Sequence, residues 1–276
     1  MNPVVNPAVN TSSSPAAPLL SVDGVTVRFG GLTAIDGVSF DVFPGELLGL
    51  IGPNGAGKTT MLRSITGVVR VTEGHVTLEG QRLDALPIQQ RIQRGMSLSQ
   101  QLVRPLRSMS VIDNVALAAG SAKTVRPLRS LLHVARTEEL AVARQMLARV
   151  GIAQHADQSP ATQPLGVLKR LEMARALALH PRLLLLDEPL AGLNSKEARA
   201  LADTIADVNR QGVTVVLIEH NLGEVMRICS RLVVLDNGRK INEGDPRTVM
   251  NDPTVRAAYL GGDAVSHAAA QGGPHA

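Results

Sequence analysis

The stretch that decides the fold is "ELLGLIGPNGAGKTTMLRSITG", residues 46–67. It starts as an apolar run typical of a buried strand, passes through a glycine-rich loop, and ends in a segment with helix-type spacing. This order of strand, loop and helix is the one that a phosphate-binding loop requires, because N–H groups at the start of a helix attract anions. The stretch therefore predicts an α/β fold with a phosphate site.

The loop within this stretch, "GPNGAGKT" at residues 52–59, matches the pattern G-x-x-x-x-G-K-[ST]. In that pattern backbone N–H groups surround the phosphates, Lys58 reaches the outer phosphates, and the Thr59 hydroxyl holds Mg²⁺. Glycines are needed because a side chain would block the close approach of the backbone. The candidate nucleotide-binding residues of this loop are Gly52, Pro53, Asn54, Gly55, Ala56, Gly57, Lys58, Thr59 and Thr60.

A second apolar run, "LLLLDEP" at residues 183–189, ends in two adjacent carboxylates. Asp187 at the end of such a strand can hold Mg²⁺ directly or through water, and Glu188 can polarise an attacking water. His220 ends the next strand candidate, in "VLIEHN". Parallel neighbouring strands end at one edge of a sheet, so we expect His220 near the γ-phosphate and assign Glu188 and His220 as catalytic candidates.

The rest of the chain divides into a β-rich start, a helical middle and an α/β end. "LLSVDGVTVRF" (19–29), "GVSFDVF" (37–43) and "GHVTLEG" (74–80) are short, valine-rich and bounded by turn residues, which predicts an antiparallel layer. Residues 88–180 lack strand alternation and carry helix-type spacing, which predicts a helical subdomain. The strand candidates "RLLLLD" and "VTVVLIEH" flank the helical segment 195–212, as in a βαβ unit of a mostly parallel sheet.

The last part of the chain carries turn and cap signals. Asn237 and Gly238 in "RLVVLDNGRKINEG" tolerate the positive φ angles of a hairpin turn. Asp245-Pro246 and Asp252-Pro253 each predict an N-cap followed by proline at the first helical position. We expect an ordered domain over residues 19–260, between a disordered leader (1–18) and a disordered tail (261–276).

Composition narrows the classes of protein that fit. With 276 residues, of which 44% are hydrophobic, the chain can bury a large core. Its single cysteine excludes an internal disulfide and favours a reducing compartment, and no apolar window approaches the roughly 18 residues of a membrane span. The net charge is +4, but only 1% of residues are aromatic, so base-stacking platforms are scarce and we do not expect nucleic-acid binding.

These motifs together resemble the ATP-binding subunits of ABC transporters, and within them those of branched-chain amino-acid and related polar amino-acid or amide uptake systems. The resemblance covers residues 19–260. Besides the phosphate loop and "LLLLDEP", it rests on "RFGGLTAIDGVSF", "MSVIDNV", "KRLEMARAL", "AGLN", "LIEHNL" and "INEGDPRTVMNDPTVRAAYLG". It implies a P-loop NTPase of ABC type, with a mostly parallel core sheet, an antiparallel β layer and a helical subdomain.

The resemblance also implies an activity and partners. Such a subunit hydrolyses ATP, with Mg²⁺, to drive solute uptake, and it dimerises head to tail around two ATP molecules. The implied partners are two membrane permease subunits, a second ATP-binding cassette and, indirectly, a periplasmic or extracellular solute-binding protein. The implied location is the cytoplasmic face of the inner membrane, as a peripheral subunit. Sequence alone does not identify the solute.

Several site residues are assigned through the resemblance. Phe29 stands where an aromatic ring stacks on adenine. Gln101 stands where a glutamine contacts Mg²⁺ and senses the membrane partner, although Gln100 replaces the aromatic residue that usually precedes it. "AGLN", residues 191–194, corresponds to the loop that couples the two ATP sites.

One stretch departs from the family. Residues 163–167 read Gln-Pro-Leu-Gly-Val, where the family has forms such as L-S-G-G-Q or L-S-Y-G-Q. Gly166 is kept as a nucleotide-binding candidate, but Pro164 has neither the serine hydroxyl nor an N–H group. The helix start behind it remains as a weaker phosphate clamp, which predicts a heterodimer with two unequal sites. In the alternative, Pro164 only fixes the loop, backbone N–H groups replace the hydroxyl, and both sites are equal.

Other classes fit the residues less well. A DNA-repair or chromosome ATPase of the same superfamily needs a long coiled-coil insertion or zinc cysteines between Gln101 and Gly166. This chain has only a compact helical segment there and a single cysteine. A translation factor of the superfamily carries two cassettes, whereas this chain has one phosphate loop. A GTPase or small-molecule kinase has no role for "LEMARAL" or "AGLN", and the chain has no N-K-x-D motif.

Overall fold

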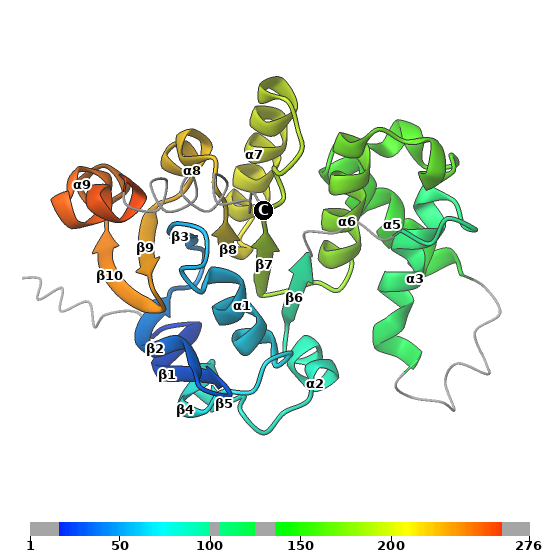
Figure 1. Ribbon diagram of the computed structural model, residues 1–276. Helices are drawn as coiled ribbons and strands as arrows, with labels where there is room; N and C mark the ends of the chain where they lie inside the picture. The colour runs from blue at the N-terminus through cyan, green and yellow to red at the C-terminus, as the bar shows by residue number, and fades with distance from the viewer. Residues whose placement is uncertain (1–16, 100–104, 125–135, 261–276) are drawn as a thin grey trace, which may run out of the picture.

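The protein is built on two sheets, as seen in the computed structural model, which describes residues 17–99, 105–124 and 136–260 (Figure 1). A six-stranded sheet has the strand order β10-β9-β3-β8-β7-β6, and a four-stranded sheet has the order β2-β1-β4-β5. In the larger sheet β3, β6, β7, β8 and β9 are parallel and β10 is antiparallel, whereas all pairs of the smaller sheet are antiparallel. The P-loop NTPase architecture of ABC type, with its antiparallel layer, is therefore confirmed.

The strands have the following bounds. The larger sheet contains β3 (Leu47–Ile51), β6 (Met96–Ser99), β7 (Leu183–Asp187), β8 (Thr214–Ile218), β9 (Arg231–Asp236) and β10 (Arg239–Gly244). The smaller sheet contains β1 (Leu20–Phe29), β2 (Leu32–Val42), β4 (Glu73–Leu78) and β5 (Gln81–Arg82).

Some helices cover the larger sheet and others form an arm beside it. They are α1 (Lys58–Thr66), α2 (Ile88–Gln93), α3 (Val111–Thr124), α5 (Thr137–Arg149), α6 (Leu165–Leu177), α7 (Ser195–Arg210), α8 (Leu222–Ile228) and α9 (Pro246–Asn251), with two 3₁₀ turns, η1 (Ala153–His155) and η2 (Pro160–Thr162), and a final helical segment at 253–260. Within the described ranges, no helix combines the length and the apolar content needed to cross a membrane.

The six-stranded sheet is covered on both faces, which explains why its strands are continuous apolar runs. In β3, Leu48 and Leu50 pack with α1 and the antiparallel layer, whereas Leu47 and Ile51 pack on the opposite face, where α6, α7 and α8 lie. Every residue of β3 and β8 is buried. The sheet therefore separates two hydrophobic cores.

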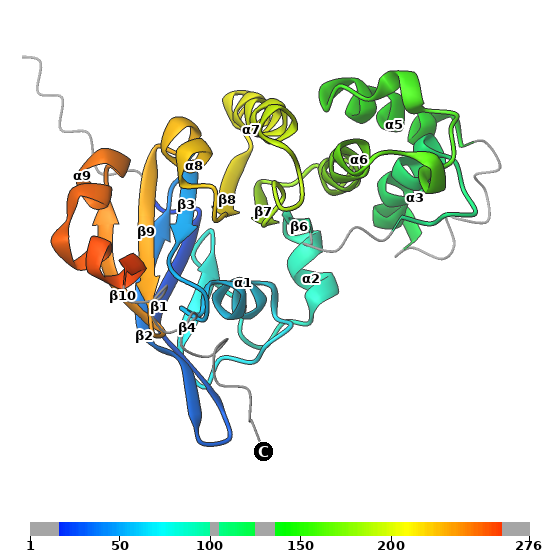
Figure 2. The same ribbon diagram turned by 45° about the horizontal axis from the view of Figure 1, so that its top comes forward.

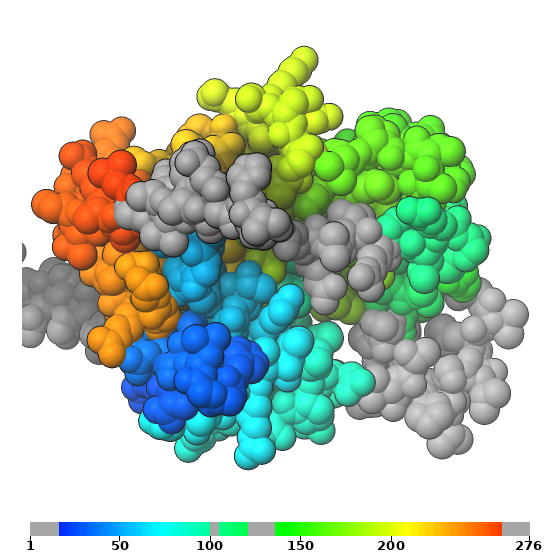
Figure 3. Space-filling model, in the orientation of Figure 1, coloured from blue at the N-terminus to red at the C-terminus, as the bar shows by residue number. Residues whose placement is uncertain are grey.

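Helices α3, α5 and α6 form a helical arm at one side of the molecule (Figures 1 and 2). Helix α6 packs against β6 and α7, and α3 and α5 pack against α6 on the side away from the sheet. In the space-filling view the arm, in green, forms a lobe beside the blue and cyan antiparallel layer (Figure 3). The arm is thus joined to the rest of the protein mainly through α6.

The predicted absence of strands from residues 88–180 is wrong at one place. Met96–Ser99 forms β6, the edge strand of the larger sheet, parallel to β7. Its sequence "MSLS" is too short to display an alternation that stands out from the surrounding helical pattern. Helix α2, which precedes β6, contacts β6. The helical arm therefore starts after β6.

The turn and cap expectations for the last part of the chain are confirmed. The β9–β10 hairpin turns at Asn237 and Gly238, whose φ angles are 45° and 77°. Asp245 caps α9 by accepting hydrogen bonds from the N–H groups of Arg247 and Thr248, at 3.0 and 3.1 Å. Asp252 likewise accepts from Thr254, at 2.7 Å, where the segment 253–260 begins. Residues 1–16 of the predicted leader and the tail 261–276 lie outside the described residues.

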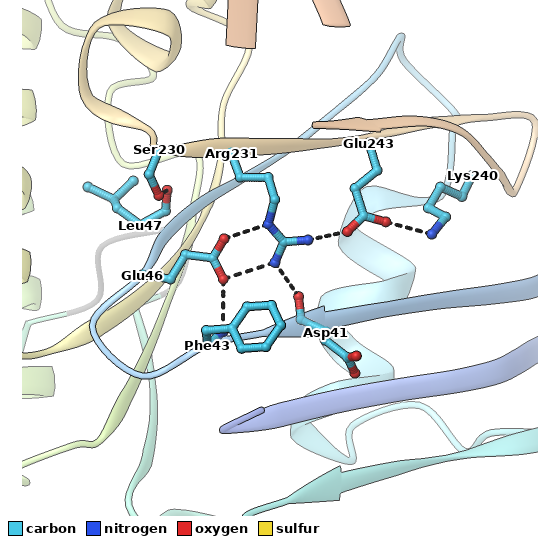
Figure 4. A network of polar contacts seen from close by, with 8 residues as sticks. All are labelled: Asp41, Phe43, Glu46, Leu47, Ser230, Arg231, Lys240 and Glu243. Carbon is cyan, nitrogen blue, oxygen red and sulfur yellow. Dashed lines mark hydrogen bonds and ion pairs between the residues drawn. The ribbon is translucent and has the colours of Figure 1, made fainter. Parts of the chain in front are cut away.

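A polar network holds the β2–β3 turn against β9 and β10 (Figure 4). The Arg231 guanidinium donates to both carboxylate oxygens of Glu46, at 2.7 and 2.9 Å, and to the Asp41 carbonyl at 2.6 Å. It also pairs with Glu243 and lies 5.5 Å from the ring centroid of Phe43. Hydrogen bonding to Glu46 raises the pKa of Arg231. One side chain thereby ties the two sheets together.

We expect replacement of Arg231 by Met to lower the free energy of unfolding by about 1.5–3 kcal/mol, because the Glu46 carboxylate, only 9% exposed, loses its charged hydrogen-bond partner. The measurement is urea unfolding followed by circular dichroism. Arg239→Met is the matched control, since the Arg239–Asp36 pair has side-chain exposures of 71% and 40%. A loss of less than about 1 kcal/mol is expected for that pair. Equal losses in the two variants would contradict the role of the network.

Candidate functional site

The site forms where three parallel strands end together. Strand β3 lies between β8 and β9, and β8 lies between β3 and β7. Leu50 of β3 and Asp187 of β7 are both in register with Ile218 of β8. The phosphate loop, Glu188 and His220 therefore leave the sheet at the same edge, as the sequence predicted.

The first and third glycines of the phosphate loop are required by packing within the protein. A Cβ on Gly52 would lie 2.0 Å from the Leu235 carbonyl oxygen, and Gly52 has a φ of 149°. A Cβ on Gly57, where φ is 99°, would lie 2.5 Å from Ile35 Cδ1 and 2.8 Å from the Ala34 carbonyl oxygen. These two glycines allow β2 and β9 to approach the loop. This packing is a second reason for glycine, besides the close approach of phosphates expected from the sequence.

The loop leads into α1 with its N-terminal N–H groups uncapped by any side chain. Gly57 is the N-cap and makes no side-chain cap hydrogen bond. The first N–H groups of a helix have no intrahelical acceptor, and the helix dipole adds partial positive charge there. The start of α1 is therefore suited to bind an anion such as a phosphate.

An open cleft of about 580 Å³ lies in front of this helix start. Its volume is in the range of small-molecule sites. The lining comes from the phosphate loop, the ends of β7 and β8, the start of β2 and the β9–β10 turn. The lining residues are 32–34, 54–60, Glu188, His220, Asn237 and Gly238.

Lys58 is buried at the base of the loop. Its ammonium group donates to the carbonyl oxygens of Gly52 and Pro53, at 2.7 and 2.9 Å. Burial lowers the pKa of Lys58, and the carboxylates of Glu188 and Asp187 oppose that shift. The lysine thus places a positive charge between the loop and the acidic end of β7.

Asp187 and Thr59 fit a magnesium ion. The Oδ1 atom of Asp187 is buried and has no hydrogen-bond partner among the described residues. Burial and the neighbouring Glu188 raise the pKa of Asp187, while Arg63, Lys58 and His220 oppose the shift. A buried carboxylate oxygen without a donor suits a hard cation that takes oxygen ligands. Thr59 lies in the first turn of α1 and supplies a hydroxyl in the cleft.

Glu188 and His220 are in contact at the cleft. His220 Nε2 lies 2.6 Å from Glu188 Oε1. The backbone of Glu188 has a φ of 49°, which is uncommon for a residue with a side chain and is found where the surrounding structure enforces it. The Glu188 N–H donates to the Ile218 carbonyl at 2.9 Å. The histidine and the backbone together orient a carboxylate that can take a proton from water.

Four residues assigned through the resemblance are not found among the described residues that line the cleft. Phe29, at the end of β1, is 50% exposed and is not among the lining residues, which at this wall are residues 32–34. Gln101 lies outside the described residues. Gly166, in the first turn of α6, has Glu197 and Leu193 as neighbours and does not line this cleft. The binding roles of Phe29, Gln101 and Gly166 stay predictions. Asn194, the last residue of "AGLN", caps α7 through a capping box with Glu197.

The sequence did not indicate two parts of the cleft wall, residues 32–34 and the β9–β10 turn. The Gly238 N–H donates to the Ala56 carbonyl at 3.1 Å, and the Asp36 N–H donates to the Gly238 carbonyl at 2.9 Å. The Asn-Gly pair predicted a turn, but nothing in the local pattern showed that the turn would lie against the phosphate loop.

Tyr259 reaches the back of the phosphate loop from the helical segment 253–260. Burial raises the pKa of Tyr259 to about 12, and the backbone N–H group of Gly52 opposes that shift. The ring packs against the core on the α6–α8 face of the larger sheet. The end of the described chain is therefore in contact with the first glycine of the loop.

The fold and the cleft define a P-loop nucleoside triphosphatase with an attached helical arm. A family model described as "ABC transporter" matches residues 35–191, and one described as "Branched-chain amino acid ATP-binding cassette transporter" matches residues 239–265. The chain belongs to the ABC transporter family and is an ATP-hydrolysing subunit of that family.

Curated relatives extend over nearly all of the chain. The chain is 40% identical over 250 residues to the high-affinity branched-chain amino acid transport ATP-binding protein LivG of Escherichia coli, covering 88% of this chain and 98% of the relative. It is 37% identical over 255 residues to BraF of Pseudomonas aeruginosa, with the same coverage. It is 31% identical to the lipopolysaccharide export ATP-binding protein LptB of Haemophilus influenzae, covering 88% and 97%.

Solved structures agree with the family assignment. The ADP conformation of an ATP-binding cassette from an ABC transporter superposes with a TM-score of 0.79 at 29% identity, covering 89% of this chain and all of that chain. A nucleotide-free cassette gives a TM-score of 0.77 at 28% identity, covering 87% and 98%. The protein accordingly binds nucleotide.

Lys58→Ala should weaken ATP binding by about 10- to 100-fold, because each hydrogen bond lost from a charged group to phosphate corresponds to roughly 1.5–3 kcal/mol. The measurement is calorimetric titration of the full chain with ATP in the absence of Mg²⁺. Lys196→Ala, which removes an exposed lysine of α7, is the control and should bind as the wild type does. An affinity of Lys58→Ala within twofold of wild type would sink the assignment of the loop.

Proposed function

We propose that this protein is the ATPase subunit of an importer for branched-chain amino acids or closely related solutes. The activity is carried by one observation, the Glu188–His220 contact at the mouth of the phosphate loop, 2.6 Å between Nε2 and Oε1. The solute class is supported by the carboxyl-terminal family match at residues 239–265 and by the names of LivG and BraF.

In the proposed reaction, the chain's own groups bind and orient ATP. The N–H groups at the start of α1 and the Lys58 ammonium hold the outer phosphates, and Lys58 exchanges its contacts with the Gly52 and Pro53 carbonyls for phosphate oxygens. Asp187 and Thr59 would hold Mg²⁺, which would neutralise charge on those oxygens when bound. Phe29 lies beside the cleft at the end of β1, from where its exposed ring reaches a bound adenine.

Glu188 is the proposed general base. Its carboxylate accepts a proton from the water that attacks the γ-phosphate, and His220 fixes the orientation of that carboxylate. The strained backbone at Glu188 directs its side chain into the cleft. Gln101 is proposed to contact the metal.

The proposed assembly contains two membrane permease subunits, a second cassette and, indirectly, a solute-binding protein outside the membrane. Within it the chain is peripheral, at the cytoplasmic face. Residues 19–260 act as one nucleotide-binding domain. No nucleic acid is part of the proposal, because aromatic residues make up 1% of the chain.

The second cassette is proposed to be a different chain. Pro164 is the N-cap of α6 and makes no side-chain cap hydrogen bond, whereas its carbonyl accepts from Val167 and Leu168 at 3.0 and 3.1 Å. Only the N–H groups of Leu165 and Gly166 are then left at the helix start to receive a partner's phosphate. A partner whose corresponding segment contains the serine would donate one more hydrogen bond to a phosphate in this chain's cleft than a second copy of this chain would.

Glu188→Gln should bind ATP with unchanged affinity and lose steady-state turnover by about 100-fold or more, because the amide keeps the shape of the side chain and accepts no proton. Phosphate release by the assembled complex is the measurement. Glu73→Gln, an exposed carboxylate on β4, should leave turnover unchanged. Full turnover in Glu188→Gln would move the base elsewhere.

The unequal-site proposal has its own test, in the complex purified from detergent-extracted membranes. Mass spectrometry should find a second, different cassette together with the permeases. Glu188→Gln in this chain should abolish nearly all turnover, and the matching change in the partner should spare much of it, since a missing hydrogen bond slows the other site by about ten- to a hundredfold. Equal losses, or a complex with this cassette alone, would defeat the proposal.

A further inference from the structure

Two buried charged side chains lie behind the cleft without lining it. Lys169 on α6 is 6% exposed, and Glu219, directly after β8, is 3% exposed. Neither is among the lining residues of the cleft. Buried charges are strongly unfavourable unless they are paired and hydrogen-bonded. Both side chains form hydrogen bonds with the backbone that follows β7, and Glu219 also with the backbone that follows β8.

Glu219 joins the turns that follow β7 and β8. Its Oε1 atom accepts a hydrogen bond from the Leu190 N–H at 2.5 Å, and its Oε2 atom accepts from the His220 N–H at 3.2 Å. The Asn221 N–H also donates to this carboxylate. One carboxylate thus fixes the backbone next to Glu188 and the backbone of His220 together.

Lys169 reaches the same turn from the helical arm. Its ammonium group lies 3.3 Å from the Glu188 carbonyl oxygen and donates to it. That oxygen also accepts from the Ala191 N–H at 3.2 Å, which closes the turn. The turn at residues 188–191 is consequently held by a cation from α6 on one side and by an anion from the end of β8 on the other.

The two side chains are also coupled electrostatically. Burial lowers the pKa of Lys169, and Glu219 is the strongest of the carboxylates that oppose this shift. Burial raises the pKa of Glu219, and its three backbone N–H donors oppose that shift. Glu219 thereby reduces the unfavourable burial of Lys169, and backbone N–H groups do the same for Glu219.

The turn needs such support because the Glu188 backbone is strained. A residue with a side chain at a φ of 49° persists only where the surroundings over-determine its conformation. Helix α6 also carries Gly166, three residues before Lys169, and connects the helical arm to the sheet (Figure 1). A displacement of α6 therefore acts on the Glu188 carbonyl through Lys169.

We propose that Lys169 and Glu219 are positioning residues that couple the conformation of the turn at residues 188–191, and with it the Glu188 carboxylate, to the position of helix α6. This coupling rests on the proposed role of Glu188 as the base. The pair touches no substrate. Its function is to make the geometry of this chain's hydrolytic site depend on the placement of its own helical arm.

The decisive experiment is hydrogen–deuterium exchange of the full chain, compared between wild type and Lys169→Met. Exchange of the amides of Glu188, Leu190 and Ala191 should accelerate about tenfold or more relative to the amides of β8, because local opening of the turn becomes easier while the sheet is unchanged. Lys169→Arg, which keeps the cation, should restore most of the protection. Glu219→Gln, which keeps the shape of the side chain, should accelerate exchange at Leu190 in the same way and serves if Lys169→Met does not fold.

Arg170→Met is the matched control. Arg170 stands next to Lys169 on α6 but donates to the Val150 carbonyl at 2.8 Å and to Thr204 Oγ1 at 2.6 Å. Its loss removes only these contacts to Val150 and Thr204 and leaves the Lys169–Glu188 hydrogen bond in place, so exchange at residues 188–191 should be unchanged. Unchanged exchange in Lys169→Met, or equal acceleration in Arg170→Met, would overturn the proposal.

Turnover gives an independent second readout. Lys169→Met should lower kcat about tenfold or more while the Kd for ATP stays within twofold, because the phosphate loop is untouched. In a double-mutant cycle with Glu219→Gln, the effects on kcat should be clearly less than additive, and additive effects would overturn the coupling. Hydrogen exchange tests whether Lys169 couples α6 to the turn, whereas turnover of Glu188→Gln tests whether Glu188 is the general base. Failure of the coupling can therefore be distinguished from failure of the proposed base.

Discussion

The structure depends on one constraint, that the six-stranded sheet is buried on both faces while its central strands end in register. Burial of both faces requires continuous apolar strands, which leaves polar chemistry only where the strands stop. Because β3, β7 and β8 are neighbours and parallel, the polar residues that follow them meet at one edge. The phosphate loop, the Asp187–Glu188 pair and the Glu219–His220 pair are thus products of sheet order as much as of local sequence.

Charge balance at this edge is achieved by distributing the ions in two layers. In the layer that faces the cleft, Lys58 stands against the carboxylates of Asp187 and Glu188. In the layer behind, Lys169 stands against Glu219, and backbone N–H groups complete the solvation of that carboxylate. A phosphate that enters the front layer alters the field around Lys58, whereas the rear layer is buried and does not line the cleft.

The sequence was sufficient for the elements whose signals are local. The strand, loop and helix at residues 46–67, the apolar run before Asp187, and the Asn237-Gly238 turn carry period, composition and turn chemistry within a few residues. It was insufficient for β6, which has four residues and no clear alternation. It also missed Lys169 and Glu219, because a charge within a helix or after a strand looks solvated until the tertiary contacts bury it. The location of Phe29 outside the cleft wall likewise depends on how β1 and β2 pair.

The contact between Tyr259 and Gly52 has an optical consequence. The chain contains one tyrosine and no tryptophan, so its near-ultraviolet emission arises from a single ring. That ring packs on the core behind the loop that receives the phosphates, and the Gly52 N–H group acts on the pKa of its hydroxyl. The unlabelled protein therefore carries one tyrosine fluorophore beside the phosphate loop, and no tryptophan emission masks it.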